Sequence, residues 1–204
     1  MTTQVSKHLT KGVRKVTTVA EIASGAFPTG SQLSVTDRVG ANFDVVSGGT
    51  PNGFDVLDAG GGDTAKLIID NKELRPKHIG MEPSLDNNQA LNRVNELFLA
   101  GEIKTLLLDE VYNTSDEYAP PTTVRFSIVG IDGGLKGDQS GLNFTDTSGT
   151  KSGLILNGTN LGWSVKNLYI KGNSTGLDGV RMSGTPTANC TAANIYVKDW
   201  GRDG

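Results

Sequence analysis

The chain has few of the residues that mark several common protein classes. Its 204 residues include one cysteine and two histidines, and aromatic residues make up 6% of the sequence. The single cysteine, Cys190, cannot build a disulfide framework within the chain. No run of about 18 apolar residues is present to span a bilayer, and the N-terminus has no signal-peptide core. These absences exclude a disulfide-stapled secreted domain and predict no membrane insertion.

Charge and short motifs give no indication of nucleic acid, a cofactor or a metal. The net charge is −3, which gives no reason to expect nucleic-acid binding. The run Gly60-Gly61-Gly62 lacks the spacing and the following helix of a phosphate loop, and indicates a hairpin turn instead. His78 has no second histidine or cysteine at ligand spacing, and Asp132 and Asp138 do not follow the order of a calcium loop. We expect no cofactor and no metal.

Glycine, in contrast, is abundant. Its 27 residues are nearly twice the average share of about 7%. Two segments, 157–171 and 183–198, also repeat each other, with Asn167 and Asn194 lying 27 residues apart (194 − 167). Short alternating strands and Gly/Asn/Thr turns at this period are typical of a β-solenoid. Because about three or more repeats are needed for a stable solenoid, we expect this chain to be the front part of a longer stack.

The alternation within these repeats predicts which side chains point inward. Tyr169 and Tyr196 lie between the apolar positions, so we expect them to face outward, one coil apart, where a neighbouring subunit could pack against them. Cys190 is expected to be a small or buried residue at a turn rather than a reactive thiol. The apolar residues at two-residue spacing are expected to stack coil upon coil: Leu154, Leu156, Leu168, Ile170, Val180, Met182, Ile195 and Val197.

The first part of the chain divides into an arm, a β module and a linker. Residues 1–30 are polar, Thr/Ser-rich and without sustained periodicity, which predicts an extended arm. Residues 31–70 contain short apolar-polar alternations separated by Gly/Asn/Pro turns, which predict a small antiparallel β module. Such a module is too small to be stable alone, so we expect it to pack against neighbouring copies or against the next domain. Residues 71–82 carry five charged side chains and Pro76 with little pattern, and are the expected linker.

The arm is basic, with four cationic residues against Glu21, a local balance of +3. Two interpretations stay open: a basic arm that docks on a larger assembly, and a disordered leader. In the first, the residues that would bind the partner are Lys7, Lys11, Arg14 and Lys15.

One helix is predicted, over about residues 87–100. Asp86 suits its N-cap and Gln89 stands at the capping-box position. Gly101 is placed to end it. Its apolar stripe consists of Leu91, Val94, Leu97 and Phe98.

Residues 83–204 resemble the entry to a pectate-lyase-like, right-handed parallel β-helix, as found in phage tailspikes and capsule depolymerases. The resemblance rests on the order of helix, Gly101, apolar strand 103–108, a Tyr112-x-x-Ser115 segment, and coils carrying Asn-Leu/Ile-Tyr-Ile/Val. The family's Pro-x-Gly-x-Tyr turn is replaced here by Asp109-Glu110-Val111-Tyr112. The resemblance implies a mainly β fold in which the α-helix caps the first coil. It also implies a homotrimer in the virion tail, with phage tail or adaptor proteins and host cell-surface polysaccharide as partners.

No catalytic constellation can be assembled from the sequence. Glycoside hydrolysis needs two carboxyl groups about 5–9.5 Å apart. Each candidate in the coils reads more readily as a turn-capping residue, so no catalytic residue is assigned: Asp146, Asp178, Asp199 and Asp203. Two functions therefore compete. One is the N-terminal attachment region of a tailspike or tail fibre, and the other is a fragment of a polysaccharide depolymerase with its catalytic coils beyond residue 204. A secreted adhesin is disfavoured by the missing export signal.

Overall fold

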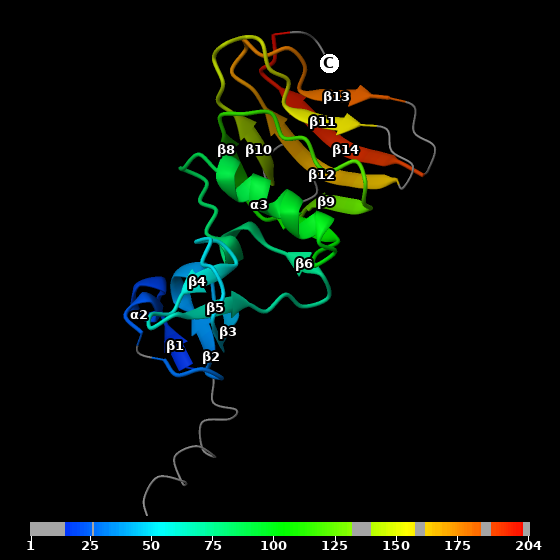
Figure 1. Ribbon diagram of the computed structural model, residues 1–204. Helices are drawn as coiled ribbons and strands as arrows, with labels where there is room; N and C mark the ends of the chain where they lie inside the picture. Colours follow the sequence, from blue (N-terminus) through cyan, green and yellow to red (C-terminus); the bar gives the residue numbers. More distant parts are fainter. Residues whose placement is uncertain (1–14, 26, 132–139, 158–161, 185–188, 202–204) are drawn as a thin grey trace, which may run out of the picture. The chain divides into compact units, whose positions relative to one another are not determined.

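The computed structural model describes residues 15–25, 27–131, 140–157, 162–184 and 189–201 (Figure 1). The chain divides into two compact units. The first contains residues 1–68 and 77–80, and the second contains residues 69–76 and 81–204. No helix within the described ranges is both long and apolar enough to cross a membrane.

The first unit is built on a five-stranded sheet in the order β1-β2-β3-β5-β4. The pairs β2–β3, β3–β5 and β4–β5 are antiparallel, as predicted, whereas β1 pairs with β2 in parallel. Its core contains Leu33, Phe43 and Ala65, all fully buried. The strands are β1 (Lys15–Thr17), β2 (Gln32–Val35), β3 (Ala41–Ser47), β4 (Val56–Asp58) and β5 (Asp63–Leu67).

The expectation of an extended arm over residues 1–30 is wrong for its described second half. β1 is a strand of the sheet, and a short helix, α2 (Val19–Ala23), follows it. Thr18 and Glu21 form a reciprocal capping box, and Ile22 is fully buried. Burial of one isoleucine and two satisfied backbone donors stabilise a turn that has no periodicity long enough to be recognised in the sequence.

The glycine run forms the predicted hairpin. Gly60, Gly61 and Gly62 connect β4 to β5, and all three have positive φ angles, between 62° and 88°. A Cβ atom on Gly60 would lie 2.7 Å from the Cα of Gly25, so the backbone of the turn packs directly against the end of α2. Only glycine satisfies both requirements at residue 60.

The predicted linker over residues 71–82 is also structured. Glu73 and Leu74 form strand β6 (Glu73–Leu74), which pairs in parallel with β7 (Thr105–Leu108) of the second unit. Residues Pro76–Ile79 form a short 3₁₀ helix, η2. Leu74 is fully buried, which explains why this charged segment holds a fixed place.

The second unit begins with the predicted helix, α3 (Asn88–Leu99). Its predicted apolar stripe is buried, and Gly101 follows it with a φ of 68°. The start of the helix differs from the prediction because the N-cap is Asn87, whose side chain caps nothing in the helix. Instead, the Asn87 amide group donates to three carbonyl oxygens, including that of Asn113 at 2.9 Å.

All strand pairs of the second unit are parallel, which confirms the predicted parallel arrangement of the repeats (Figure 1). One sheet has the order β6-β7-β9-β12-β10-β8, with β14 also paired to β12, and a second sheet consists of β11 and β13. The remaining strands are β8 (Val111–Thr114), β9 (Phe126–Gly130), β10 (Gly141–Phe144), β11 (Leu154–Asn157), β12 (Trp163–Lys171), β13 (Val180–Ser183) and β14 (Thr191–Lys198).

Partner residues in these sheets lie one turn of the chain apart. Ser164 pairs with Ser127 and with Thr191, which lie 37 residues before it (164 − 127) and 27 after it (191 − 164). β12 turns a corner at Asn167, because its first half pairs with β9 and its second half with β10. Strands that are paired in parallel at Ser164 therefore lie 27 and 37 residues apart in the sequence.

The predicted inward-pointing residues divide into two groups. Leu154, Leu156, Leu168 and Ile170 are at most 1% exposed. In β13 and β14 the equivalent residues Val180, Ile195 and Val197 are only partly buried, and Met182 is 59% exposed. These two strands each pair on one side only among the described strands, so nothing described there covers their free edge.

The two tyrosines are aligned as predicted. Tyr169 pairs with Tyr196, and the rings stack with centroids 5.7 Å apart and an interplanar angle of 11°. Tyr169 is 5% exposed and Tyr196 is 39% exposed. The expectation that both rings are presented outward is therefore met by Tyr196, while Tyr169 is covered.

Candidate functional site

Lys15 is the one proposed docking residue that the structure describes. It lies in β1, and its Nζ atom is 5.4 Å from the centroid of the Phe27 ring. This cation–π contact holds the side chain against the first unit, so Lys15 belongs to the folded module rather than to a free arm. Lys7, Lys11 and Arg14 lie outside the described residues.

The candidate carboxylates do not gather in one place. Asp199 has a φ of 59° and lies 3.9 Å from the ammonium group of Lys198. The backbone carbonyl of Asp178 accepts a hydrogen bond from the Gly153 N–H at 2.8 Å. Asp146 alone of the described candidates joins a larger cluster of charged groups, and Asp203 lies outside the described residues.

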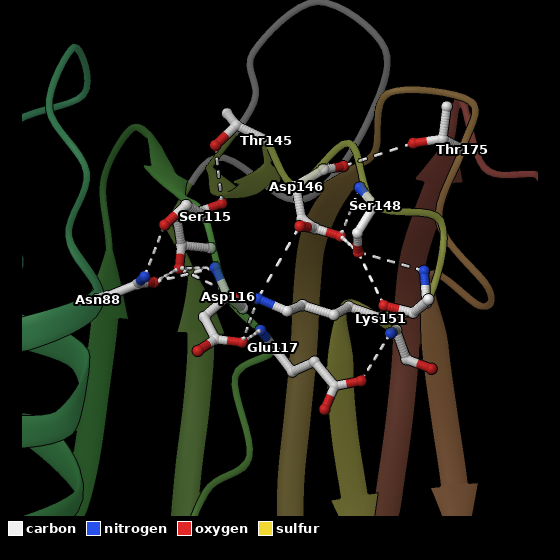
Figure 2. A network of polar contacts seen from close by, with 12 residues as sticks. Asn88, Ser115, Asp116, Glu117, Thr145, Asp146, Ser148, Lys151 and Thr175 are labelled. Atoms are coloured by element: carbon white, nitrogen blue, oxygen red, sulfur yellow. Dashed lines mark hydrogen bonds and ion pairs between the residues drawn. The ribbon is translucent and has the colours of Figure 1, made fainter.

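That cluster is centred on Lys151 (Figure 2). Its Nζ atom lies 3.2 Å from Oδ1 of Asp116 and 3.9 Å from Oδ1 of Asp146. The neighbouring Glu117 accepts a hydrogen bond from the N–H of Ser152 at 2.7 Å. Asp116 and Glu117 follow β8, Asp146 follows β10, and Lys151 precedes β11. The cluster thus joins two stacked corners of successive turns of the chain to the segment that leads into β11.

Polar side chains extend this connection along the corners. The Thr145 hydroxyl donates to the carbonyl oxygen of Thr114 at 3.2 Å. Asn173, after β12, donates to the carbonyl oxygen of Asp146. On the helix side, Asn88 donates to the hydroxyl of Ser115 at 2.8 Å. Hydrogen bonds therefore connect three neighbouring corners and the start of α3 in one network (Figure 2).

A small pocket of about 10 Å³, room for about one water molecule, opens beside this network. Asp116, Asp146 and Lys151 supply its charged lining, and Phe144 and Trp200 supply aromatic lining. The two rings are in contact, with centroids 5.7 Å apart. Three further residues complete the lining: Ser152, Asn173 and Gly176.

Glycines hold the Trp200 ring in place. A Cβ atom on Gly176 would lie 2.4 Å from the indole, and one on Gly153 or Gly172 would lie 2.8 or 2.7 Å from it. Gly153 precedes β11, and Gly172 and Gly176 lie in the connection between β12 and β13. A larger residue at any of the three would collide with the ring. The aromatic wall of the pocket is consequently fixed in position.

The surroundings of Lys151 favour its charged form. The hydrogen bond to Asp116 raises the pKa of Lys151, and the nearby charges of Asp116, Asp146 and Glu117 act in the same direction while desolvation opposes them. The side chain therefore stays an ammonium ion and cannot serve as a general base near neutral pH. Within the described ranges, no group of three His, Cys, Asp or Glu side chains could hold a metal ion.

Sequence reasoning identified Asp146 but missed Asp116, Lys151 and Trp200. These residues come from separate corners, and only the stacking of the coils brings them together. The close spacing of Gly172, Gly176 and Gly179 was the available signal, because glycines at turns can make room for a large ring as well as for a positive φ angle.

No protein-family model and no curated protein sequence matches the chain. Among solved structures, the chain is similar to the crystal structure of the enzymatically active domain of tailspike protein 2 of bacteriophage CBA120. The TM-score is 0.43 and the sequence identity is 12%. The match covers 97% of this chain and 37% of that one. This chain therefore spans little more than a third of the length of that distant neighbour.

Proposed function

We propose that this chain is the N-terminal region of a bacteriophage tailspike or tail fibre. It attaches a homotrimeric spike to the virion tail and supports a distal β-helix that recognises host-surface polysaccharide. The observation that carries the proposal is the second unit, in which parallel strands stack turn upon turn. An α-helix lies before β7, and among the described strands β13 and β14 are each paired on one side only.

In this proposal the second unit is the entry to a right-handed parallel β-helix, and α3 is its cap. α3 connects β6 to β7, the first strands of the stack. Its residue Phe98 contacts Phe126 of β9, with ring centroids 5.7 Å apart. Covering the first strands with an amphipathic helix protects a sheet edge that would otherwise pair with other chains.

The exposed apolar side chains of β13 and β14 support further coils in the proposed spike. Met182 and Tyr196 continue rows whose preceding members, Leu156 and Tyr169, are buried. Further coils would bury these side chains in the same way. The proposal places host-polysaccharide recognition in those coils.

In the first unit, the proposal assigns virion docking to the basic residues that precede β1. Lys7, Lys11 and Arg14 would bind an acidic groove on a tail or adaptor protein, with Lys15 at the junction to the folded sheet. Small modules of this kind gain stability from neighbouring copies, which agrees with a trimer. The attachment would be electrostatic and would weaken as salt screens the charges.

The experiment compares two triple variants in a pull-down with tails that lack spikes. The test variant is K7E/K11E/R14E. The control variant is K166E/R181E/K198E, which makes the same change in charge at three exposed positions of the second unit. We expect the test variant to lose tail binding and the control variant to keep it. Equal binding by both variants would rule out docking through the basic residues.

The competing function is a fragment of a polysaccharide depolymerase. The pocket with Asp116 and Asp146 is the observation that favours it, since paired carboxylates are the usual machinery of glycoside hydrolysis. A cleavage assay on capsular polysaccharide distinguishes the two functions. Cleavage by the 204-residue chain would establish the depolymerase and overturn the structural assignment, whereas cleavage only by a longer product would place the catalytic coils further along.

A further inference from the structure

We propose that Asn52 is a deamidation site that reacts when its turn in the first unit opens, and that the reaction then keeps the turn open. Asn52 precedes Gly53 in one of the two Asn-Gly pairs of the sequence. Gly53 has no Cβ atom to hinder the approach of its backbone nitrogen to a neighbouring carbonyl carbon. The site lies between β3 and β4, and the proposal is independent of the tail attachment proposed above.

The chemistry needs only these two residues and water. The backbone nitrogen of Gly53 attacks the side-chain carbonyl carbon of Asn52 and forms a cyclic succinimide. The bond from that carbon to Nδ2 breaks, and the amide group leaves as ammonia together with the proton of the Gly53 nitrogen. Water then opens the ring at either carbonyl group, which gives aspartate or isoaspartate. A neutral amide that donates hydrogen bonds is thereby replaced by a carboxylate that only accepts them.

The folded turn holds the atoms that would have to move. Oδ1 of Asn52 accepts hydrogen bonds from the N–H groups of Phe54 at 2.9 Å and Val56 at 3.1 Å. Nδ2 of Asn52 donates to Oδ1 of Asp55 at 3.0 Å. The attacking nitrogen is also engaged, because the Gly53 N–H donates to the carbonyl oxygen of Val56 at 3.1 Å. Attack therefore requires these hydrogen bonds to break first.

The rate of deamidation should follow how often the turn opens. Gly53 is exposed and Asn52 is half-buried, and surface turns of this kind open locally without unfolding of the whole domain. When closing is fast compared with a chemical step, that step proceeds in proportion to the population of the open form. Deamidation of Asn52 would thus record the accumulated opening of this turn.

The product should not close again, because of Asp55. Asp55 is 1% exposed, and its carboxylate accepts a hydrogen bond from the amide of Asn52. After deamidation a second carboxylate would stand where that donor was. Two carboxylates at hydrogen-bond distance in a buried site repel each other, and the bond that joined the two side chains is lost. The reaction therefore acts in one direction, as an irreversible switch on the turn.

The first test compares deamidation in the folded chain and in the same chain unfolded in concentrated urea. Both samples are kept at one temperature in the same mildly alkaline buffer, and peptide mapping by mass spectrometry follows Asn52 over time. We expect deamidation to be at least about tenfold slower in the folded chain, because the turn must open first. Equal rates in the two samples would overturn the protection by the turn.

The second test measures the effect of the product with N52D, which carries its aspartate form. Hydrogen exchange of the backbone amides in β4 and β5 should become about tenfold faster in N52D. Q32E, at an exposed position of β2, makes the same change in charge and should leave the exchange rates unchanged.

D55N and the double variant N52D/D55N complete a double-mutant cycle. The double variant exchanges the donor and the acceptor, so we expect exchange slower than the two single effects combined would give. Exchange in N52D as slow as in Q32E, or additive effects of N52D and D55N, would overturn the switch at Asp55.

Discussion

Asn194 donates a hydrogen bond from its side-chain amide to the side-chain oxygen of Asn167 at 3.0 Å. The two residues are 27 positions apart (194 − 167) and have nearly the same φ angle, 54° and 57°. Both lie at a corner within a long strand, and at Asn167 the pairing of β12 changes from β9 to β10. The side-chain hydrogen bond therefore connects two residues that have the same backbone conformation in neighbouring strands.

The first prediction concerns this corner. N167A should destabilise the chain by about 2 kcal/mol, because alanine disfavours the left-handed conformation and cannot accept the bond from Asn194. N167G should cost less, about 1 kcal/mol, since glycine tolerates the positive φ angle and only the bond is lost. Urea unfolding measures both. N92A, at an exposed position of α3, is the control. An N167G variant as unstable as N167A would show that backbone strain does not matter at this corner.

The second prediction concerns the glycine contacts of Trp200. G176A should destabilise the chain by about 1–3 kcal/mol through overpacking, because the added Cβ would lie 2.4 Å from the indole. Gly176 has no positive φ angle, so backbone strain does not contribute. In a W200A background the same substitution should cost much less. A double-mutant cycle by thermal unfolding gives the coupling between residues 176 and 200, and a coupling near zero would contradict the packing described here.

The third prediction is a pH dependence at Asp86. Burial by itself would raise the pKa of Asp86, but hydrogen bonds from the Ser115 hydroxyl at 2.7 Å, its N–H at 3.0 Å and the Asn88 N–H outweigh this effect and lower the pKa. Because the pKa is lowered on folding, the ionised carboxyl stabilises the fold, and this contribution is complete above the unfolded-state pKa of about 3.9. It is lost as the pH falls through the lower folded-state value.

D86N should accordingly be less stable than the wild type at neutral pH, by about 1 kcal/mol, given the exposure of the group. The difference should shrink below about pH 4, where the wild-type carboxyl becomes protonated. Urea unfolding at neutral pH and near pH 3 measures it, with the exposed Asp70 replaced in D70N as the control. A difference of the same size at both pH values would show that the charge of Asp86 is unimportant.

The fourth prediction concerns Lys151. The hydrogen bond to Asp116 is the largest cause that raises the pKa of Lys151. This hydrogen bond contributes its full stability below the ordinary lysine pKa of about 10.4. The contribution is lost only as the pH rises through the higher pKa of Lys151 in the folded state. K151M should therefore lower the melting temperature by the same small amount at about pH 6 and about pH 9, and by less in concentrated salt. A marked change in this melting-temperature difference between the two pH values would point to another titrating group.

The local sequence was sufficient for the elements with a strong period. The stripe Leu91, Val94, Leu97 and Phe98 predicted α3 to within one residue at each end. The local sequence pattern did not predict α2, because five residues are too few to show a helical period. It also did not predict β6, which buries a single leucine within a charged segment. Pairing with a partner strand holds β6, and that partner follows it by about 30 residues.

The candidate site was mostly hidden from sequence reasoning for the same reason. Asp146 could be recognised as an acidic residue at a turn. The ion pair between Lys151 and Asp116 could not be predicted, because Asp116 lies 35 residues earlier in the sequence (151 − 116). Trp200 was visible as an aromatic residue near a strand end. Its contact with Phe144 depends on the stacking of two coils.

The amino-acid sequence by itself determined the spacing of the paired strands β12 and β14, the alternation that buries Leu168 and Ile170, and the positions of the glycine and asparagine turns. These features depend on neighbours one to four residues away, where backbone geometry allows few alternatives. The tertiary structure decided which corners meet, which charges pair, and which polar groups lie at one pocket. Contacts such as Lys151–Asp116 and Phe144–Trp200 join residues 35 and 56 positions apart (151 − 116 and 200 − 144). They form only after the parallel strands have paired in register.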